Sequence, residues 1–358
     1  MSQEVCSRFS AGISYRLSES GKERPRLAIS EVLTVSYKKG FHVAGSEISW
    51  SNRRFDRRQA TVSFQGEDYE AIVVGSDSQI GGMMRSQAEK GKIFRELHQR
   101  DRAFIIPNPW DVGTARLLAR LGFEALATTS AGFAFSIGQR DNTVGRERMI
   151  AHVRDIAAAT DLPVSADLEN GFGDDPETAA ETIGIGAAAG LVGGSIEDSN
   201  GRKEDPIYEI GRAAERIRAA ADVAHSLPFT FTLTARAENY LFGRLDLKDT
   251  IKRLQAYQQA GADVLYAPGL ATKDDIAAVV SSVDRPVNIL MGLAGVNMSV
   301  TELSAIGVKR ISVGSVLSRV ALSAFIRAAE EMRENGTFAF GEDVISFRDI
   351  SAMFTDPR

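Results

Sequence analysis

Short apolar runs alternate with helix-patterned segments along the chain from residue 103 onward. The apolar runs have the length and composition of buried strands. In the segments between them, apolar residues recur every three or four positions, which is typical of amphipathic helices, as in residues 113–122, 146–160, 207–224 and 249–261. The pattern predicts eight strands, which begin at Ala103, Ala125, Pro163, Leu191, Phe229, Asp263, Pro286 and Val308.

Glycine stands between several predicted helices and the strands that follow. Gly122, Gly190, Gly261 and Gly307 fit the left-handed position that ends a helix. Near-continuous apolar strands separated by helices indicate a parallel sheet covered by helices, and eight such units close into a (β/α)8 TIM-type barrel. An open doubly wound sheet is the alternative, but no strand is followed by the G-x-G-x-x-G turn of that fold.

The first 83 residues differ from the rest. They are rich in Ser and Arg, lack helical periodicity and contain only short strand-like pieces such as residues 70–75. We interpret residues 1–83 as an N-terminal extension, poorly ordered or absent from the native protein, with Met83 or Met84 as the candidate start. Residues 84–358 are expected to form the barrel, which ends in a C-terminal helical tail.

Composition narrows the class of protein. With 44% hydrophobic and 25% charged residues the chain is typical of a globular protein, and no run approaches the roughly 18 apolar residues of a membrane helix. A net charge of -5 predicts no nucleic-acid partner. The lone cysteine, Cys6, excludes an internal disulfide and a thiolate metal cluster. The N-terminus has no apolar signal core, so we expect a cytoplasmic protein without a membrane partner.

Acidic side chains gather where the predicted strands end, which is where barrels of this type carry their chemistry. These acids are Asp141, Asp167, Glu169, Glu197, Asp198 and Glu238. The two-residue spacing of Asp167 and Glu169 places both on one side of a strand. Crowded carboxylates need a cation, and an all-oxygen set favours Mg²⁺, with Mn²⁺ as the other candidate. The alternative is that the acids cap helices or form salt bridges, above all Asp198 and Glu238.

Histidine does not support a different chemistry. The four histidines, His42, His98, His152 and His225, fall in the extension or on predicted helices. A zinc site or a His-based catalytic triad is therefore disfavoured.

Two further groups could hold an anionic substrate. Arg236 can grip a carboxylate in bidentate fashion, unless it forms a salt bridge with Glu238 or Glu197. Residues 128–132 are small and hydroxylated, so Ser130 and nearby backbone N–H groups could approach a carboxylate, although an ordinary tight turn has the same composition. A small-molecule carboxylate is the predicted ligand.

At these residues the chain resembles the isocitrate lyase/phosphoenolpyruvate mutase superfamily, from about Ser86 to the C-terminus. The resemblance is carried by five ordered motifs, which are NPWDVGTARLLARLGFEALATTSAG at 108–132, GQRD ending at Asp141, SADLENGFGD at 165–174, SIED at 195–198 and TARAEN at 234–239. It implies a barrel whose last helix is exchanged between subunits of a homodimer or homotetramer. It also implies an enolate of pyruvate or oxaloacetate type, stabilised by the metal.

The resemblance assigns roles to individual residues. It implies a metal site at Asp141, Asp167, Glu169 and Glu197, with Asp167 as the direct ligand and the others acting mainly through water. It further implies that Thr129, Ser130 and Ala131 hold the carboxylate and keto oxygen of the substrate and that Arg236 grips it. We also expect Glu238 and Asn288 to bind the substrate, and Arg236, Glu197 and Asp141 to be catalytic.

The departures from the family pattern bear on the reaction. Family lyases that cleave isocitrate or 2-methylisocitrate carry a K-[KR]-C-G-H loop after the fourth strand, whereas this chain has the short, cysteine-free EDSNGRKEDPIYE, and Glu169 replaces the usual aspartate. We therefore expect a Mg²⁺-dependent lyase or decarboxylase acting on a small 2-oxo or 2-hydroxy acid, oxaloacetate-like or 2-methylisocitrate-like. Decarboxylation is favoured, because a small enolate can be protonated by water.

Two other functions stay open at this point. One is phosphorus–carbon bond chemistry of the mutase or hydrolase type, for which Arg202 or Lys203 would have to grip the phosphonate. Asn200 and Lys203 are also the nearest counterparts of the longer loop that such family members carry. The other is a non-catalytic barrel that binds a keto acid.

Overall fold

The computed structural model describes residues 27–28, 58–64, 67–73 and 84–355, and the chain divides into two units, Met1–Met83 and Met84–Arg358. In the first unit, β1 (Leu27–Ala28), β2 (Arg58–Phe64) and β3 (Glu67–Val73) form a sheet of order β1-β3-β2. The strand-like piece at 70–75 lies partly in β3. The remainder of residues 1–83, with Cys6, His42 and Met83, lies outside the described residues, so the expectation of poor order stays a prediction.

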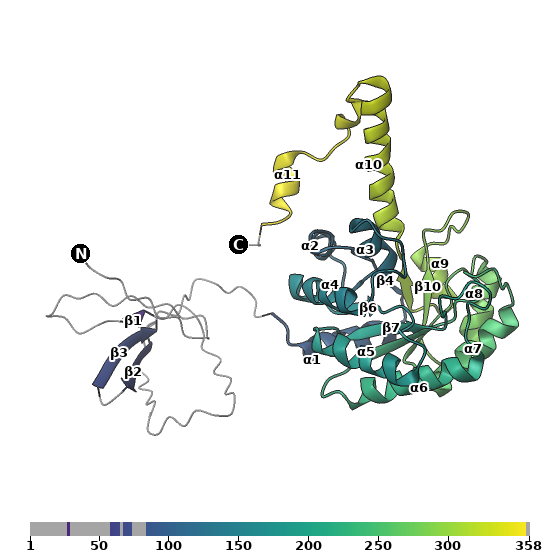
Figure 1. Cartoon of the computed structure of the whole chain (residues 1–358), viewed down its shortest axis with the longest axis horizontal. Coiled ribbons are helices and arrows are strands. Elements are labelled where there is room, and N and C mark those ends of the chain that lie inside the picture. Colours follow the sequence, from purple (N-terminus) through teal and green to yellow (C-terminus); the bar gives the residue numbers. More distant parts are fainter. Residues whose placement is uncertain (1–26, 29–57, 65–66, 74–83, 356–358) are drawn as a thin grey trace. The chain divides into compact units, whose positions relative to one another are not determined.

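Eight parallel strands form the second unit's sheet, which confirms the predicted (β/α)8 barrel (Figure 1). Hydrogen-bonded neighbours follow the order β4-β11-β10-β9-β8-β7-β6-β5, and β4 is joined to β5 through a hydrogen bond of 3.1 Å from the Ala127 N–H to the Pro107 carbonyl. The strands are β4 (Phe104–Ile106), β5 (Leu126–Ala127), β6 (Val164–Asp167), β7 (Gly193–Glu197), β8 (Thr232–Arg236), β9 (Val264–Tyr266), β10 (Val287–Leu290) and β11 (Arg310–Ser312).

Helices alternate with these strands, and most of them cover the outside of the barrel. They are α1 (Gln87–Gln99), α2 (Val112–Arg120), α3 (Ser130–Ser136), α4 (Arg146–Ala159), α5 (Pro176–Ala188), α6 (Ile210–Ser226), α7 (Leu247–Gln259), α8 (Lys273–Ser281), α9 (Val300–Ala305), α10 (Val316–Asn335) and α11 (Phe347–Ala352). All four glycines predicted to end helices have positive φ, from +87° at Gly122 to +108° at Gly261. Among the described helices, none has the length and hydrophobicity needed to cross a membrane.

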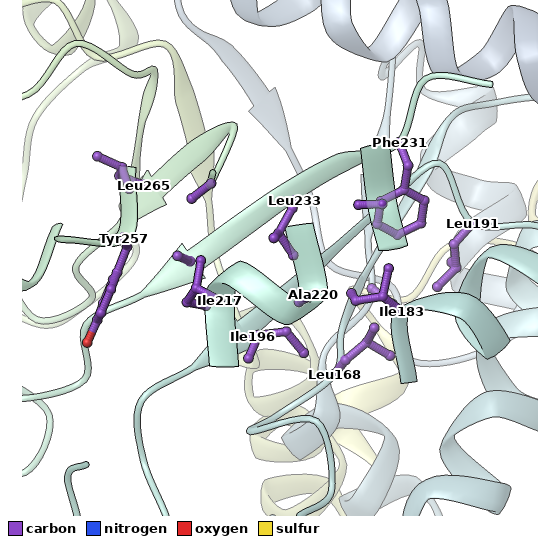
Figure 2. Close-up of a cluster of buried hydrophobic side chains, with 14 of the residues drawn as sticks. Leu168, Ile183, Leu191, Ile196, Ile217, Ala220, Phe231, Leu233, Tyr257 and Leu265 are labelled. Carbon is purple, nitrogen blue, oxygen red and sulfur yellow. The ribbon is translucent and has the colours of Figure 1, made fainter. Parts of the chain in front are cut away.

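The main core lies between the strands and the surrounding helices. Figure 2 shows Ile196 and Leu233 from the sheet packed with Ile183 and Ile217 from the helices. Side chains alternate along a strand, so Ile196 faces the helices while its neighbour Glu197 faces the barrel interior. The apolar positions that hold the helices thereby determine which polar side chains enter the barrel.

Helix α1 packs against the start of the barrel strands. Its buried Phe94 and Leu97 belong to a small cluster with Phe104 of β4. The approach is close, since a Cβ atom on Gly91 would lie 2.2 Å from the carbonyl oxygen of Thr230. This contact closes the amino-terminal end of the barrel, and the polar cavity lies at the other end.

Helix α10 extends away from the barrel, and α11 follows it (Figure 1). Large apolar side chains along both helices are exposed, including Phe325 and Ile326 of α10 and Phe347 of α11. Ser318 is the one α10 residue that is buried among those described. Helices α10 and α11 therefore carry an apolar surface that the barrel does not cover.

Candidate active site

A polar cavity of about 290 Å³ opens where the strands end. Five neighbouring strands contribute side chains at matching register positions, namely Glu197, Arg236, Tyr266, Asn288 and Arg310. Every residue predicted to bind substrate lines this cavity, together with three of the four predicted metal residues; the exception is Glu169. The structure therefore brings these predicted residues together in one cavity, and their roles stay predictions.

Arg236 is the centre of an ion-pair network. Its Nε lies 2.9 Å from Oε1 of Glu238, its Nη1 2.9 Å from Oδ1 of Asp167 and its Nη2 3.3 Å from Oε2 of Glu197. Burial alone would lower the pKa of Arg236, but these carboxylates raise that pKa well above its ordinary value. The salt bridges considered as the alternative role of Arg236 are thus present.

Ser130 is the first residue of helix α3, so the predicted small-residue turn is a helix start. Thr129 caps this helix, and its hydroxyl accepts a hydrogen bond of 3.2 Å from the Gly132 N–H. Ser130 donates to Oδ2 of Asp167 from its hydroxyl at 2.9 Å and from its backbone N–H at 3.3 Å. The carboxylate that this segment binds here is that of Asp167.

The spacing argument for Glu169 was wrong in its geometry. Strand β6 ends at Asp167, and Glu169 follows in the left-handed conformation with φ of +51°, so strand alternation does not orient it. The Glu169 side chain is buried, and its Oε1 has no hydrogen-bond partner among the described residues. Burial, and next the charges of Asp167, Asp141 and Glu197, raise the pKa of Glu169 to about 8.

Asp141 and Glu197 complete the acidic group. Asp141 lies in the loop after α3, where burial of its carboxyl and the charge of Asp167 raise its pKa. Glu197 accepts a hydrogen bond of 2.5 Å from the Ser199 hydroxyl. Burial also raises the pKa of Glu197, with a contribution from Asp167 that opposes the effect of Arg236. Mutual repulsion is thus a property shared by the acids around Asp167.

The acidic group fits a divalent cation in its chemistry. Its donors are all carboxylate oxygens, and one of them, Oε1 of Glu169, is buried without a hydrogen-bond partner among the described residues. The repulsion among these carboxylates would decrease when a cation binds. Within residues 84–355, no three of these side chains already converge as a ready metal cluster, because Asp167 is held by Arg236 and Ser130. A cation that binds Asp167 would therefore replace one of its present contacts, with Arg236 or with Ser130.

Asp198 has a structural role, unlike its neighbour Glu197. Its Oδ2 accepts hydrogen bonds of 2.5 Å from the Tyr257 hydroxyl and 3.1 Å from Arg253, and its Oδ1 accepts one of 2.8 Å from the Glu238 N–H. These contacts join the strand ends to helix α7. The salt-bridge alternative considered for Asp198 is the one that the structure supports.

The described histidines lie outside the cavity. His152 stacks on Phe133 at 3.7 Å between ring centroids, His225 lies 3.3 Å from Asp263, and His98 lies on α1. None of the three is a cavity-lining residue. That the site does not rely on histidine stays a prediction.

Polar residues that were not predicted also line the cavity, among them Asn108, Tyr266 and Arg310. The Tyr266 ring lies 5.2 Å from the guanidinium carbon of Arg236, and burial raises the Tyr266 pKa to about 12. Asn108 accepts hydrogen bonds of 2.9 Å from the Val313 and Gly314 N–H groups and thereby joins β4 to β11. Asn108 and Tyr266 lie at or just after the end of a strand, so the rule that found the acids could have found them.

The loop after β7 does not reach the cavity with its cations. Arg202 pairs with Asp174 at 2.6 Å, and neither Arg202 nor Lys203 lines the cavity. Asn200 donates to the Asp205 carbonyl at 2.7 Å and so stabilises the loop itself. The phosphonate grip that the phosphorus–carbon alternative requires is not supplied by these side chains.

Comparison with known proteins adds a family to this geometry. The profile of the phosphoenolpyruvate phosphomutase family matches residues 94–333. The chain belongs to this family. The match covers the barrel except for its start, and it includes most of α10. The family lies within the isocitrate lyase/phosphoenolpyruvate mutase superfamily that the motifs resemble.

Three proteins illustrate what this chain is similar to. A Burkholderia cenocepacia J2315 protein provisionally described as a lyase/mutase is 62% identical, with a TM-score of 0.74, and the match covers 76% of this chain and 97% of that chain. The 2-methylisocitrate lyase of Halalkalibacterium halodurans is 26% identical, over 75% of this chain and 94% of the relative. Oxaloacetate acetylhydrolase in complex with its product oxalate is 26% identical with a TM-score of 0.67, over 75% and 93%. The family member described here is therefore an enzyme of the carbon–carbon lyase type.

Proposed function

We propose that this enzyme cleaves a carbon–carbon bond next to the functional group of a small 2-oxo or 2-hydroxy acid and requires Mg²⁺. The observation that carries the proposal is the group of acids around Asp167, which contains a buried carboxylate oxygen without a partner and lies beside Arg236. Members of the superfamily typically depend on Mg²⁺, which supports this choice of ion. Two of the named relatives are named for 2-methylisocitrate and oxaloacetate, which supports the substrate class.

The residues that would hold the ion are Asp167, as the direct ligand, with Asp141, Glu169 and Glu197 around it. When bound, the ion supplies a Lewis acid that stabilises the negative charge of an enolate oxygen. An all-oxygen donor set suits Mg²⁺ and also Mn²⁺. Glu169 would have to ionise, and the positive charge of the ion would offset the repulsion from the neighbouring carboxylates that, after burial, raises the pKa of Glu169 in the metal-free protein.

Arg236 and the start of α3 would bind the substrate's acid end. Arg236 has a planar guanidinium suited to a carboxylate, and one of its three present partners, Asp167, is the proposed metal ligand. When Asp167 turns to the ion, Nη1 of Arg236 and the Ser130 hydroxyl become available as donors. Thr129, Ala131, Glu238 and Asn288 line the same cavity and complete the proposed substrate contacts. Glu197 and Asp141 would hold or transfer protons at its edge.

We also propose a homodimer or homotetramer in which α10 packs against a neighbouring subunit. Phe325 is 70% exposed and Phe347 is 87% exposed, so these helices leave large apolar groups in water when the chain is alone. Light scattering of the purified protein tests this, and we expect a multiple of the monomer mass. Phe325→Asp should shift the mass toward the monomer.

One set of assays tests the proposed function. The purified protein with Mg²⁺ is given oxaloacetate, 2-methylisocitrate, isocitrate and phosphonopyruvate, and the release of pyruvate, glyoxylate and phosphate is followed. We expect cleavage of a carbon–carbon bond that stops when the metal is chelated. If phosphonopyruvate is the only substrate that reacts and phosphate is released, the enzyme breaks a phosphorus–carbon bond and the proposal is wrong. Tight Mg²⁺-dependent binding without any turnover would indicate a keto-acid sensor.

A further inference from the structure

The backbone that follows β6 adopts a left-handed conformation at three of four successive residues. Glu169 has a φ of +51°, Gly171 of +80° and Phe172 of +63°. Glycine accepts this conformation freely, but a residue with a Cβ atom disfavours it and keeps it only where surrounding contacts hold the chain. The segment 169–174 therefore depends on contacts from other elements.

Arg216 of α6 makes three hydrogen bonds to this segment. Its Nε donates to the carbonyl oxygen of Asp174 at 3.1 Å, and its Nη2 donates to the carbonyl oxygens of Gly173, at 2.7 Å, and of Asn170. The Arg216 side chain is buried, and its guanidinium carbon lies 4.5 Å from the centroid of the Tyr208 ring. The rigid fork of a guanidinium suits this task, because the carbonyl groups lie at both ends of the segment.

Two other side chains hold the same segment from outside the cavity. Tyr208 donates from its hydroxyl to Oδ1 of Asp174, and Thr182 of α5 donates to the carbonyl oxygen of Gly171 at 2.8 Å. A Cβ atom on Gly171 would lie 2.9 Å from a backbone carbon of α5, so the segment packs directly on that helix. None of Arg216, Tyr208 and Thr182 lines the cavity.

The backbone of Glu169 is also held by residues of the site itself. Its N–H donates to Oδ1 of Asp167 at 3.3 Å, and its carbonyl accepts from the Glu197 N–H at 3.0 Å. Asp167 is the proposed metal ligand, so a bound ion competes for the first of these contacts. The contact of Arg216 with the next carbonyl, that of Asn170, does not involve the proposed ligand. Arg216 can therefore hold this backbone while the contacts of Asp167 change.

The direction of the Glu169 side chain depends on this backbone. The side chain is buried, and its Oε1 has no hydrogen-bond partner among the described residues, so no contact of that oxygen fixes its position. A change of φ at Glu169 to the right-handed or extended region would turn the side chain and move its carboxylate relative to Asp167.

We propose that Arg216 is a positioning residue for Mg²⁺, which holds residues 170–174 so that Glu169 keeps the left-handed conformation that directs its carboxylate toward the ion. This inference rests on the proposed function, in which Glu169 is one of the acids around the ion. It adds to that site a residue that contacts neither the ion nor the substrate. Residues that orient metal ligands in this way typically change metal affinity by about 10- to 100-fold when they are replaced.

Calorimetry of Mg²⁺ binding to the full chain tests the inference without reference to turnover. Arg216→Lys keeps the positive charge, but one ammonium group cannot reach the carbonyl groups at both ends of the segment. We expect the Kd for Mg²⁺ to rise by about tenfold or more. Arg212→Lys is the matched control, because Arg212 lies one turn earlier in α6 and also donates to the Asp174 carbonyl, at 3.2 Å, from a partly exposed position. Its Kd should stay within about twofold of the wild type.

A double-mutant cycle separates positioning from general support of the fold. If Arg216 acts through the Glu169 carboxylate, its effect requires that carboxylate. Glu169→Ala should raise the Kd for Mg²⁺ at least as much as Arg216→Lys does, and adding Arg216→Lys to Glu169→Ala should change the Kd by less than about twofold. Losses that multiply in the double variant overturn the inference, since Arg216 would then act by another route.

A second variant keeps the test decisive if Arg216→Lys does not fold. Tyr208→Phe removes the hydroxyl that binds Asp174 and keeps the ring beside the guanidinium. It should raise the Kd for Mg²⁺ by at least about threefold, because the segment loses one of its anchors. An unchanged Kd in folded Arg216→Lys, or in Tyr208→Phe where the lysine variant does not fold, overturns the inference.

The two proposals can fail separately. Mg²⁺-dependent turnover by the wild type, combined with an unchanged Kd in Arg216→Lys, overturns only the inference about Arg216. An affinity for Mg²⁺ that depends on Arg216 through Glu169, in a protein that cleaves none of the substrates offered, overturns the proposed function and supports the positioning role.

Discussion

Asp167 and Arg236 are joined by a hydrogen bond of 2.9 Å between Oδ1 and Nη1, although 69 residues separate them in the chain. The proposed metal ligand and the proposed substrate clamp therefore neutralise each other in the metal-free site. A cation that takes over Asp167 frees one edge of the guanidinium. Metal and substrate binding are thus expected to favour one another, and the coupling must be reciprocal.

Removal of the Asp167 carboxylate should abolish metal-dependent turnover. In Asp167→Ala we expect activity to fall by at least about 100-fold, because the variant loses the proposed direct ligand. Circular dichroism should show an intact fold. Asp274→Ala, at an exposed acid in the first turn of α8, serves as the control and should stay within about twofold of the wild type. Metal-dependent activity retained by Asp167→Ala would contradict the ligand assignment.

Arg236→Lys should weaken substrate binding. An ammonium group keeps the charge but cannot replace the three directed contacts that Arg236 makes, nor a bidentate contact to a carboxylate. We expect KM to rise by about tenfold or more in steady-state kinetics with Mg²⁺. An unchanged KM would count against Arg236 as the clamp.

The stability of the metal-free protein should fall as pH rises toward 8. Burial and the neighbouring carboxylates raise the pKa of Glu169 to about 8, from an ordinary value of 4.5. Its stabilising contribution is complete below the lower value, because both states are then protonated. It is lost as pH rises through the higher one, since the unfolded chain ionises more easily. Thermal unfolding in a chelator at about pH 6 and about pH 8.5 measures the difference.

Added Mg²⁺ should oppose this loss, because the ion binds ionised carboxylates. The stabilisation by Mg²⁺ should therefore be larger at the higher pH. Glu169→Gln cannot ionise, so its metal-free stability should vary less between the two pH values. A wild-type protein equally stable at both values without metal would be inconsistent with the raised pKa of Glu169.

Asp198→Ala should destabilise the fold more than a neighbouring change at the surface. The substitution leaves Arg253 without its buried partner and removes the acceptor of the Tyr257 hydroxyl, at a cost of about 3 kcal/mol or more. Asp249→Ala removes the half-buried second partner of Arg253 and should cost about 1 kcal/mol or less. Urea unfolding of both variants measures the difference, and equal losses would argue against a structural role specific to Asp198.

Two glycine substitutions should have opposite effects. A Cβ atom at Gly91 would overlap the Thr230 carbonyl, so Gly91→Ala must push α1 away from β8, and we expect a loss of about 1–3 kcal/mol. Gly211, in the first turn of α6, has open space around it, so Gly211→Ala should be neutral or stabilising by up to about 1 kcal/mol. Thermal unfolding distinguishes them, and a stable Gly91→Ala variant would show that α1 can shift without cost.

The sequence by itself determined the barrel and which of the predicted residues would share one end of it. Eight apolar runs separated by amphipathic helices leave few other ways to bury all the helices, and the polar residues that end parallel strands must meet at one edge. Asp167, Glu197 and Arg236 were predicted to meet in this way, and they line one cavity. The same reasoning could not separate Glu197 from its neighbour Asp198, because both end the same strand.

Tertiary structure decided which side chains share an environment. Glu169 follows the end of β6 and has a positive φ, so the direction of its side chain depends on the local backbone and not on the alternation of side chains along a strand. Arg310 begins its strand and was missed by a rule that inspects strand ends. Its strand β11 is only three residues long and pairs Arg310 with Asn288, so its first residue borders the cavity. Register between strands distant in sequence sets these neighbours, and periodicity within a single segment carries no information about it.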